Sequence, residues 1–254
     1  MKNIKTFENF NNQDIFKHIV DKDIKSVNNY INAGYDLNVQ DKYGNTLLML
    51  AAISDIEILE LLLNSGADID KQNNKGHTAL ILAAFYNNVE IVKLLLNSGA
   101  DIDKQNDLGN TALIIAARNN NLEIVKLLLN AGADMDKQNV YKENALHYAI
   151  INSNFNIVKL LLDASIDMDK QNSRGETALI WAARNNNLEI IEILLDYHAD
   201  EFILDDNNKS FYDYLNDKNK KYFLKEYANK VYNAIYHEYK KSFTEFVKDY
   251  NTKN

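Results

Sequence analysis

The chain of 254 residues contains no cysteine and no proline, and only 8 glycines. Without cysteine it can form neither a disulfide nor a thiolate zinc site, and it has no cysteine nucleophile. No segment reaches the roughly 18 uncharged apolar residues that a membrane-spanning helix needs. The first ten residues carry two lysines with no apolar run behind them. We therefore expect a soluble, cytoplasmic protein without a membrane span, and delivery into a host cell is compatible with this.

Positive charge and catalytic motifs are also scarce. The net charge is -8, and residues 208–254 hold ten lysines against six acidic residues, a local balance of +4 that leaves -12 on residues 1–207. Phosphate binding needs a continuous basic surface, so the acidic body argues against a nucleic-acid partner. The five histidines lie far apart in the sequence, and no metal-binding, nucleophile or phosphate-loop motif occurs. The sequence predicts no catalytic residue, no cofactor and no metal site, and hence no enzyme.

What the chain has instead is an internal repeat with a period of 33 residues. The tetrapeptide Asp-Lys-Gln-Asn begins at residues 70, 103, 136 and 169. Triplets of large apolar residues keep the same period and occupy 61–63, 94–96, 127–129, 160–162 and 193–195. A fixed period of this length is typical of proteins built by stacking one small structural unit.

Each unit predicts two helices separated by a turn and followed by a long loop. A threonine precedes the first apolar segment in four of the units, and its hydroxyl can accept a hydrogen bond from a free amide of the first helical turn. Asparagine-rich breaks at 87–88, 119–121 and 185–187 follow, and asparagine tolerates the left-handed conformation that ends a helix. A second helix such as 122–129 then ends at Gly132. The threonines are Thr46, Thr78, Thr111 and Thr177.

Three phrases of the sequence, at 76–80, 90–96 and 99–103, resemble the ankyrin repeat. The resemblance implies an all-α solenoid of stacked helix-turn-helix units with β-hairpin-like loops. It implies a divergent N-terminal capping unit at 1–40, and a degenerate unit with a helical cap at 205–254. Five full repeats would lie between them, at 41–72, 73–105, 106–138, 139–171 and 172–204.

The repeats depart from the family pattern in ways that bear on the site. The family's proline is missing throughout, and its helix histidine survives only as His147, which we expect to be buried. Asn144 replaces the capping threonine of the same unit, so repeat 139–171 is the least regular. Trp181 is expected to pack in the core rather than to stack on a ligand. We expect His77 and His198 at exposed loop or turn positions, and the Asp-x-Asp pairs in turns rather than in calcium sites.

The resemblance also implies where a partner binds. In ankyrin stacks the variable residues of the loop tips and of the inner-helix ends line one concave face, and tyrosine, phenylalanine and arginine are common anchors of interfaces. Ordinary surface variation is the alternative for any single position. The candidate partner-binding residues are Tyr43, His77, Phe85, Tyr86, Leu108, Arg118, Tyr141, Ile151, Arg174 and Arg184.

The C-terminal residues differ in composition from the repeats. They carry a stripe of apolar residues that recur every three or four positions, as on one side of a helix. We expect this segment to cap the last repeat; the alternatives are docking of a partner or of a second copy, and, third, a membrane surface. The stripe consists of Phe223, Tyr227, Val231, Ile235, Tyr239, Phe243, Phe246 and Tyr250.

The leading functional prediction is a non-enzymatic scaffold that binds another protein on the concave face. The alternative is a host-directed effector or regulatory protein whose C-terminal helical tail mediates assembly or a second interaction. We expect a monomer, with self-association through the tail as the alternative.

Overall fold

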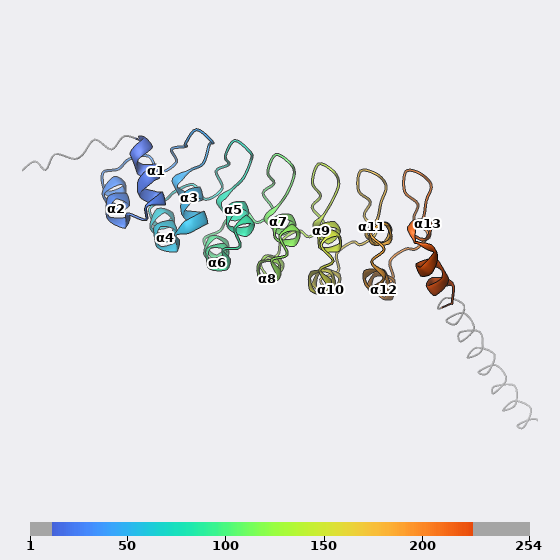
Figure 1. Cartoon of the computed structure of the whole chain (residues 1–254). Helices are drawn as coiled ribbons and strands as arrows, with labels where there is room; N and C mark the ends of the chain where they lie inside the picture. Colours follow the sequence, from blue (N-terminus) through green and yellow to red (C-terminus); the bar gives the residue numbers. More distant parts are fainter. Residues whose placement is uncertain (1–11, 226–254) are drawn as a thin grey trace, which may run out of the picture.

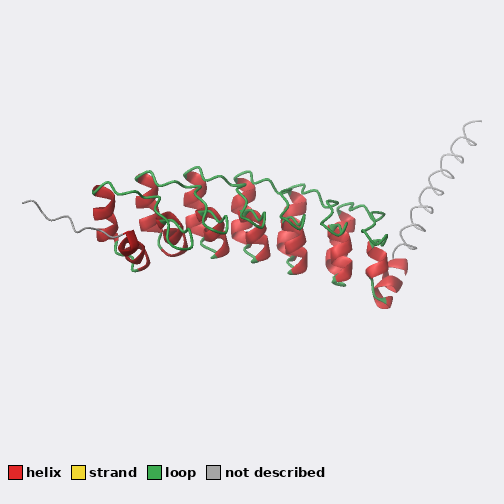
Figure 2. Cartoon of the chain, turned by 90° about the horizontal axis from the view of Figure 1, so that it is seen from above, coloured by secondary structure: helices red, strands yellow, loops and turns green. Residues whose placement is uncertain are grey.

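A computed structural model describes residues 12–225 of the chain. The described part is a row of paired helices that stack in sequence order, with a long loop between consecutive pairs (Figures 1 and 2). Within these residues there is no named strand, and the loops contain a single isolated β-bridge, between Gln40 and Thr46. The prediction of an all-α repeat solenoid is therefore confirmed.

The helices fall into two sets. The inner helices lie next to the loops and are α1 (Asn12–Val20), α3 (Leu47–Ser54), α5 (Ala79–Phe85), α7 (Ala112–Arg118), α9 (Ala145–Ile151), α11 (Ala178–Arg184) and α13 (Phe211–Tyr214). The outer helices are α2 (Ile24–Asn32), α4 (Ile56–Asn64), α6 (Val89–Asn97), α8 (Leu122–Asn130), α10 (Phe155–Asp163) and α12 (Leu188–Asp196). Residues 217–225 are also helical. Each inner helix packs on its neighbouring inner helices and, up to α11, on its own outer helix.

Polar side chains cap the N-termini of the inner helices, as the sequence predicts. The amide of Ile81 donates to Thr78 Oγ1 at 3.2 Å, and Thr46, Thr111 and Thr177 make the equivalent bond. In the irregular repeat, Asn144 Oδ1 accepts from the amides of Leu146 and His147. Such a cap typically stabilises a helix by ~1 kcal/mol. The caps therefore fix where every inner helix from α3 to α11 begins.

The turn between the two helices of a pair uses a left-handed residue. Asn87, Asn120 and Asn186 have φ values of 59°, 64° and 50°, and Ser153 has 53° in the irregular repeat. Repeat 41–72 is one residue shorter and has no such residue; Asp55 ends α3 and begins α4 by accepting from the amide of Ile58. The predicted asparagine turns are confirmed. In the shorter turn of repeat 41–72, Asp55 alone connects the two helices.

A ladder of glutamine side chains joins each loop to the next. In every Asp-Lys-Gln-Asn tetrapeptide the glutamine Nε2 donates to a carbonyl of its own loop and to a carbonyl 33 residues further on. Gln105, for example, donates to the Gly109 carbonyl at 2.6 Å and to the Gln138 carbonyl at 3.0 Å. The ladder begins at Gln40 and ends at the Leu204 carbonyl. It ends there because Leu204 occupies the position of the next glutamine and has no side-chain amide to donate. The ladder therefore fixes the spacing of consecutive loops.

The aspartates of the same segment form a second ladder. Asp101 Oδ1 accepts from the amide of Asp103, and Asp103 Oδ1 accepts from the amide of Asp134 in the next repeat. The same pattern continues to Asp200, whose amide donates to Asp169. The Asp-x-Asp pairs thus serve turns, as predicted, and they also join consecutive repeats, which the sequence did not predict. No group of acidic or histidine side chains suited to a metal ion occurs within residues 12–225.

Candidate protein-binding face

The loop tips are rigid because side chains and backbone close each of them. In the loop before α7, Asn106 Oδ1 accepts from the amides of Leu108 and Asn110, and the Asn106 amide donates to the Asn110 carbonyl. The Leu108 carbonyl accepts from the amide of Val140, so one tip is bonded to the next. Tyr43, Lys75, Tyr141 and Arg174 occupy the same position in the other loops, and each of their carbonyls accepts from the following loop.

The C-terminal ends of the inner helices carry the second group of candidates. Phe85 ends α5 and is followed by Tyr86, while Arg118, Ile151 and Arg184 end α7, α9 and α11. Asparagine side chains link some of these ends, because Asn119 Nδ2 donates to the Phe85 carbonyl and Asn152 Nδ2 to the Arg118 carbonyl. We call the loop tips at 43, 75, 108, 141 and 174, together with these helix ends, the loop–helix face.

Six of the ten predicted partner-binding residues are large apolar side chains exposed to solvent. Their exposed fractions lie between 45% for Phe85 and 60% for Tyr43. A rigid scaffold that exposes aromatic side chains side by side offers anchors for a partner. The six are Tyr43, Phe85, Tyr86, Leu108, Tyr141 and Ile151.

The sequence predicted that His77 and His198 lie at exposed loop or turn positions, and the two predictions have different outcomes. His198 is exposed in the turn after α12, as predicted, and has φ 68°. His77 lies in a loop, as predicted, but the prediction that it is exposed is wrong, because its side chain is half-buried. Burial lowers the pKa of His77, and the positive charges of Lys75 and Arg118 lower it further, although Asp107 raises it.

The three arginines differ in their surroundings. Arg174 is exposed at a loop tip. Arg184 forms an ion pair with Glu176, whose side chain is only 3% exposed, and its guanidinium lies 5.3 Å from the ring centre of Tyr214. Arg118 is half-buried, with its guanidinium 6.0 Å from the ring centre of Tyr148.

Tyr148, next to Arg118, makes polar contacts with side chains of the preceding loop. Its hydroxyl accepts from Asn139 Nδ2 at 3.1 Å and hydrogen bonds with Glu143. Burial raises the pKa of Tyr148 to about 12, and the neighbouring Glu143 carboxylate adds to that effect. Tyr148 is therefore neutral at physiological pH, and Asn139 Nδ2 donates to both Tyr148 and Glu143.

His147 and Trp181 belong to the packing beneath this face. His147 is buried, as predicted, and its Nδ1 lies 2.8 Å from Asn144 Oδ1. Burial lowers its pKa from 6.5 to about 4, so the ring is neutral at pH 7. Trp181 packs edge-to-face against His147, with the ring centres 5.1 Å apart, but stays half-buried rather than fully enclosed. Trp181 is not part of the buried core cluster, so the prediction that it packs in the core is wrong; the ring contact with His147 is its packing contact in the structure.

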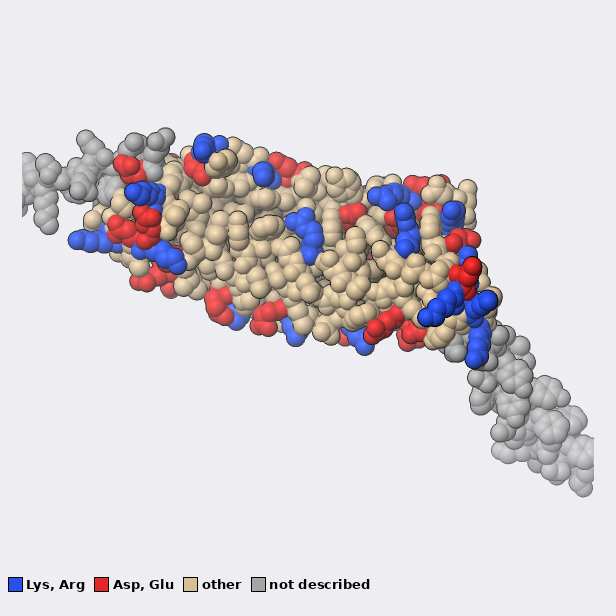
Figure 3. Space-filling view, in the orientation of Figure 1, with Lys and Arg blue, Asp and Glu red and all other residues tan. Residues whose placement is uncertain are grey.

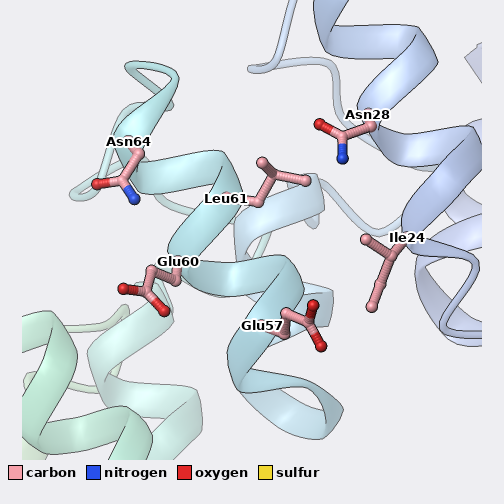
Figure 4. A pocket seen from close by; sticks show the side chains of 6 residues that line it. All are labelled: Ile24, Asn28, Glu57, Glu60, Leu61 and Asn64. Atoms are coloured by element: carbon pink, nitrogen blue, oxygen red, sulfur yellow. The ribbon is translucent and has the colours of Figure 1, made fainter.

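A separate shallow hollow lies between the outer helices α2 and α4. Figure 4 shows Ile24 and Asn28 on α2 across from Leu61, with Glu57, Glu60 and Asn64 from α4 around them. The hollow is open to solvent and contains no histidine, serine or cysteine. It offers no grouping of acid, base and nucleophile.

Two large apolar side chains are exposed near the C-terminal end of the described stack. Phe202 and Leu204, which replace polar residues of the tetrapeptide, are exposed there. Phe223, the first residue of the predicted stripe, packs edge-to-face on Phe211 at 5.9 Å. The remaining members of the stripe, Tyr227, Val231, Ile235, Tyr239, Phe243, Phe246 and Tyr250, lie outside the described residues.

Charge is scarce over the middle of the view in Figure 3, and charged side chains gather toward the two ends and along the lower edge, where the outer helices lie. No helix within residues 12–225 is long and apolar enough to cross a membrane.

Stacked helix pairs joined by projecting, hydrogen-bonded loops define a helical repeat protein of the solenoid class. Ankyrin-repeat family models match residues 10–106, 98–172 and 154–195, and the chain belongs to the ankyrin-repeat family. Ankyrin repeats are in general protein-interaction modules without catalytic activity. A comparison with curated proteins finds no match.

Solved structures support the same assignment. The crystal structure of the ankyrin repeat domain of Bcl-3, described as a unique member of the IkappaB protein family, is similar with a TM-score of 0.76 and 26% sequence identity. The similarity covers 83% of this chain and 97% of that domain.

Two features of the face were missed by reasoning from the sequence. The ion pair between Arg184 and Glu176 joins residues eight positions apart, one in a loop and one at a helix end. The glutamine ladder was visible only as a recurring letter in the Asp-Lys-Gln-Asn tetrapeptide. The partner of Arg184 becomes evident only when the loop is placed beside the helix end, and the partners of the glutamines only when consecutive loops are placed side by side.

Proposed function

We propose that the protein is a non-enzymatic scaffold, acting in the cytoplasm, that binds another protein on the loop–helix face. The observation that supports this proposal best is the set of exposed aromatic and aliphatic side chains at the loop tips and the inner-helix ends, with the tips joined to one another by hydrogen bonds. Ordering of these loops is already complete before a partner arrives, which lowers the entropic cost of association.

The outer helices provide the natural comparison. Most of their exposed positions are charged or polar, although Ile56 at the start of α4 is 45% exposed. Glu90 and Lys93 of α6 pair with each other at 3.0 Å. Glu123 and Lys126 are likewise exposed on α8. A surface of this kind keeps the scaffold soluble and offers few anchors.

The test is quantitative affinity capture from the source cells with three forms of the full chain. The face variant carries Tyr43→Ser, Phe85→Ser and Tyr86→Ser; the matched control carries Glu90→Ser, Glu123→Ser and Lys126→Ser. We expect the wild type and the control to retain the same proteins and the face variant to lose them, with all three showing similar thermal unfolding. Equal capture by the face variant would count against the proposal.

Arg184 is unsuitable for such a variant. Its removal would leave the buried Glu176 carboxylate without its ion-pair partner, a loss that costs about 1–3 kcal/mol. A binding defect in Arg184→Ala would therefore mix recognition with instability. Arg118, which has no such partner, can be changed at a smaller cost in stability.

A further inference from the structure

Two arginines of the face occupy the same place in repeats that are 66 residues apart. Arg118 ends α7 and Arg184 ends α11, and each guanidinium lies near a tyrosine ring supplied by the next repeat. The tyrosines, Tyr148 and Tyr214, are also 66 residues apart. The two sites are thus internal copies of one another, and differences between them can be traced to single residues.

The difference lies eight residues before each arginine. At Arg184 this position is Glu176, whose carboxylate forms the ion pair. At Arg118 it is Asn110, which is buried and whose Oδ1 accepts from Asn139 Nδ2 at 3.2 Å. The amide carries no charge, so the repeat that presents Arg118 lacks the internal counter-ion of its copy.

Arg118 is consequently an unpaired cation. Within residues 12–225 its guanidinium takes part in no ion pair and no side-chain hydrogen bond; its one recorded ring contact is with Tyr148. Glu143 lies on the adjoining loop, but its carboxylate is engaged by Asn139 and Tyr148. A half-buried cation without a counter-ion is partly desolvated, which favours an anion from outside.

Aromatic side chains adjoin this cation. Asn119, the residue after Arg118, donates to the Phe85 carbonyl at 3.0 Å, which ties the end of α7 to the end of α5. Phe85 and Tyr86 stand edge-to-face with ring centres 5.2 Å apart, and both are exposed. An apolar surface therefore lies one repeat away from the charge.

We propose that Arg118 binds the carboxylate of an aspartate or glutamate in a segment of the partner protein, while an apolar side chain of that segment packs on Phe85 and Tyr86. This inference rests on the proposed function and names the chemistry of the partner. A single cation on a body of net charge -12 over residues 1–207 suits a monovalent carboxylate better than a phosphate, which carries more negative charge.

The experiment uses a random peptide library displayed on phage and selected on the full chain, followed by fluorescence-polarisation titration of the enriched peptides. Asn110→Glu installs beside Arg118 the counter-ion that Glu176 supplies to Arg184. Asn110→Gln is the matched control, of equal length and without charge. We expect enriched peptides to share an acidic position near an apolar one. They should bind Asn110→Glu at least about tenfold more weakly, and Asn110→Gln nearly as well as wild type.

Exchange of the shared acid for its amide in the peptide should cause a similar loss on the wild type and little further loss on Asn110→Glu. The inference is overturned if no peptide is enriched, if the enriched peptides share no acidic position, or if Asn110→Glu binds them as tightly as wild type. Tighter binding of a phosphoserine in place of the acid would overturn the assignment of a carboxylate. The capture experiment judges the proposed function separately, because loss of capture by the face variant does not depend on an acidic residue in the partner, whereas the Asn110→Glu test does.

Discussion

Single residues with positive φ determine where each repeat turns, and they are not equivalent. Gly109 in a loop tip has φ 74°, and Gly132 after α8 has φ 87°. A Cβ atom on Gly109 would lie 2.9 Å from Asn139 Cα, whereas a Cβ on Gly132 would meet nothing within 4 Å. Both glycines supply a left-handed backbone, but only Gly109 also lets the next loop approach.

This comparison predicts two different costs for the same substitution. Gly132→Ala should destabilise the protein by about 1–2 kcal/mol, the cost of a left-handed alanine. Gly109→Ala should cost a further ~1–3 kcal/mol because the backbone of the next loop must move. Urea unfolding followed by circular dichroism measures both, and equal costs would contradict the close contact between loops.

His147 makes stability depend on pH. Its folded pKa of about 4 lies below the unfolded value of 6.5. The unfolded chain therefore binds a proton first as the pH falls, so the stability that is present above pH 6.5 is lost as the pH falls toward 4. A difference of this size corresponds to roughly 3 kcal/mol.

His147→Ile is the matched control for that prediction, because isoleucine occupies this position in α5, α7 and α11. We expect the variant to lose less stability than wild type between pH 6.5 and 4 when both are unfolded with urea at each pH. Parallel curves for the two proteins would show that His147 is not the titrating group.

At the scale of the helices, four of the five apolar triplets of the outer helices have one buried member each, whereas in 160–162 both Leu161 and Leu162 are buried. Leu128 is fully buried, while Leu127 and Leu129 on either side are half-buried. The same holds for Leu62, Leu95 and Leu194 and their neighbours. The middle residue of the triplet therefore carries most of the packing against adjacent repeats.

The two positions predict different losses on truncation. Leu128→Ala should cost about 2–5 kcal/mol, because it removes buried contacts and leaves a cavity. Leu127→Ala should cost about 1 kcal/mol. Thermal and urea unfolding distinguish them, and a larger loss for Leu127→Ala would show that α8 packs with another face toward the core.

The helices and caps could be predicted from the sequence because they depend on residues close together in the chain. The threonine caps lie three residues from the amides they bind, and the asparagine turns follow from one residue's conformation. The exposure of His77 was predicted wrongly because burial is a property of the folded stack and not of a residue's own loop. Arg184 has an ion-pair partner because Glu176 lies eight residues before it, and Arg118 has none among residues 12–225 because Asn110 lies there. The repeat pattern treats these two residues as equivalent positions and so does not predict the difference.

At the scale of the whole molecule, the ladders of Gln and Asp side chains connect every loop to the next, so the stack behaves as a chain of nearest neighbours. Such a scaffold places its loop tips at regular intervals and leaves them exposed. The family assignment and the similarity to the Bcl-3 ankyrin repeat domain agree with this architecture. The central claim of the account is that a protein partner meets the loop–helix face rather than the outer helices.

Site-specific photo-crosslinking tests that claim most directly. A photoreactive phenylalanine analogue replaces Tyr86 or Tyr141 on the loop–helix face, or Lys126 on α8, in the full chain expressed in the source cells. We predict a crosslinked protein product from both tyrosine positions and none from Lys126. Crosslinking from Lys126, with none from Tyr86 and Tyr141, would contradict the account.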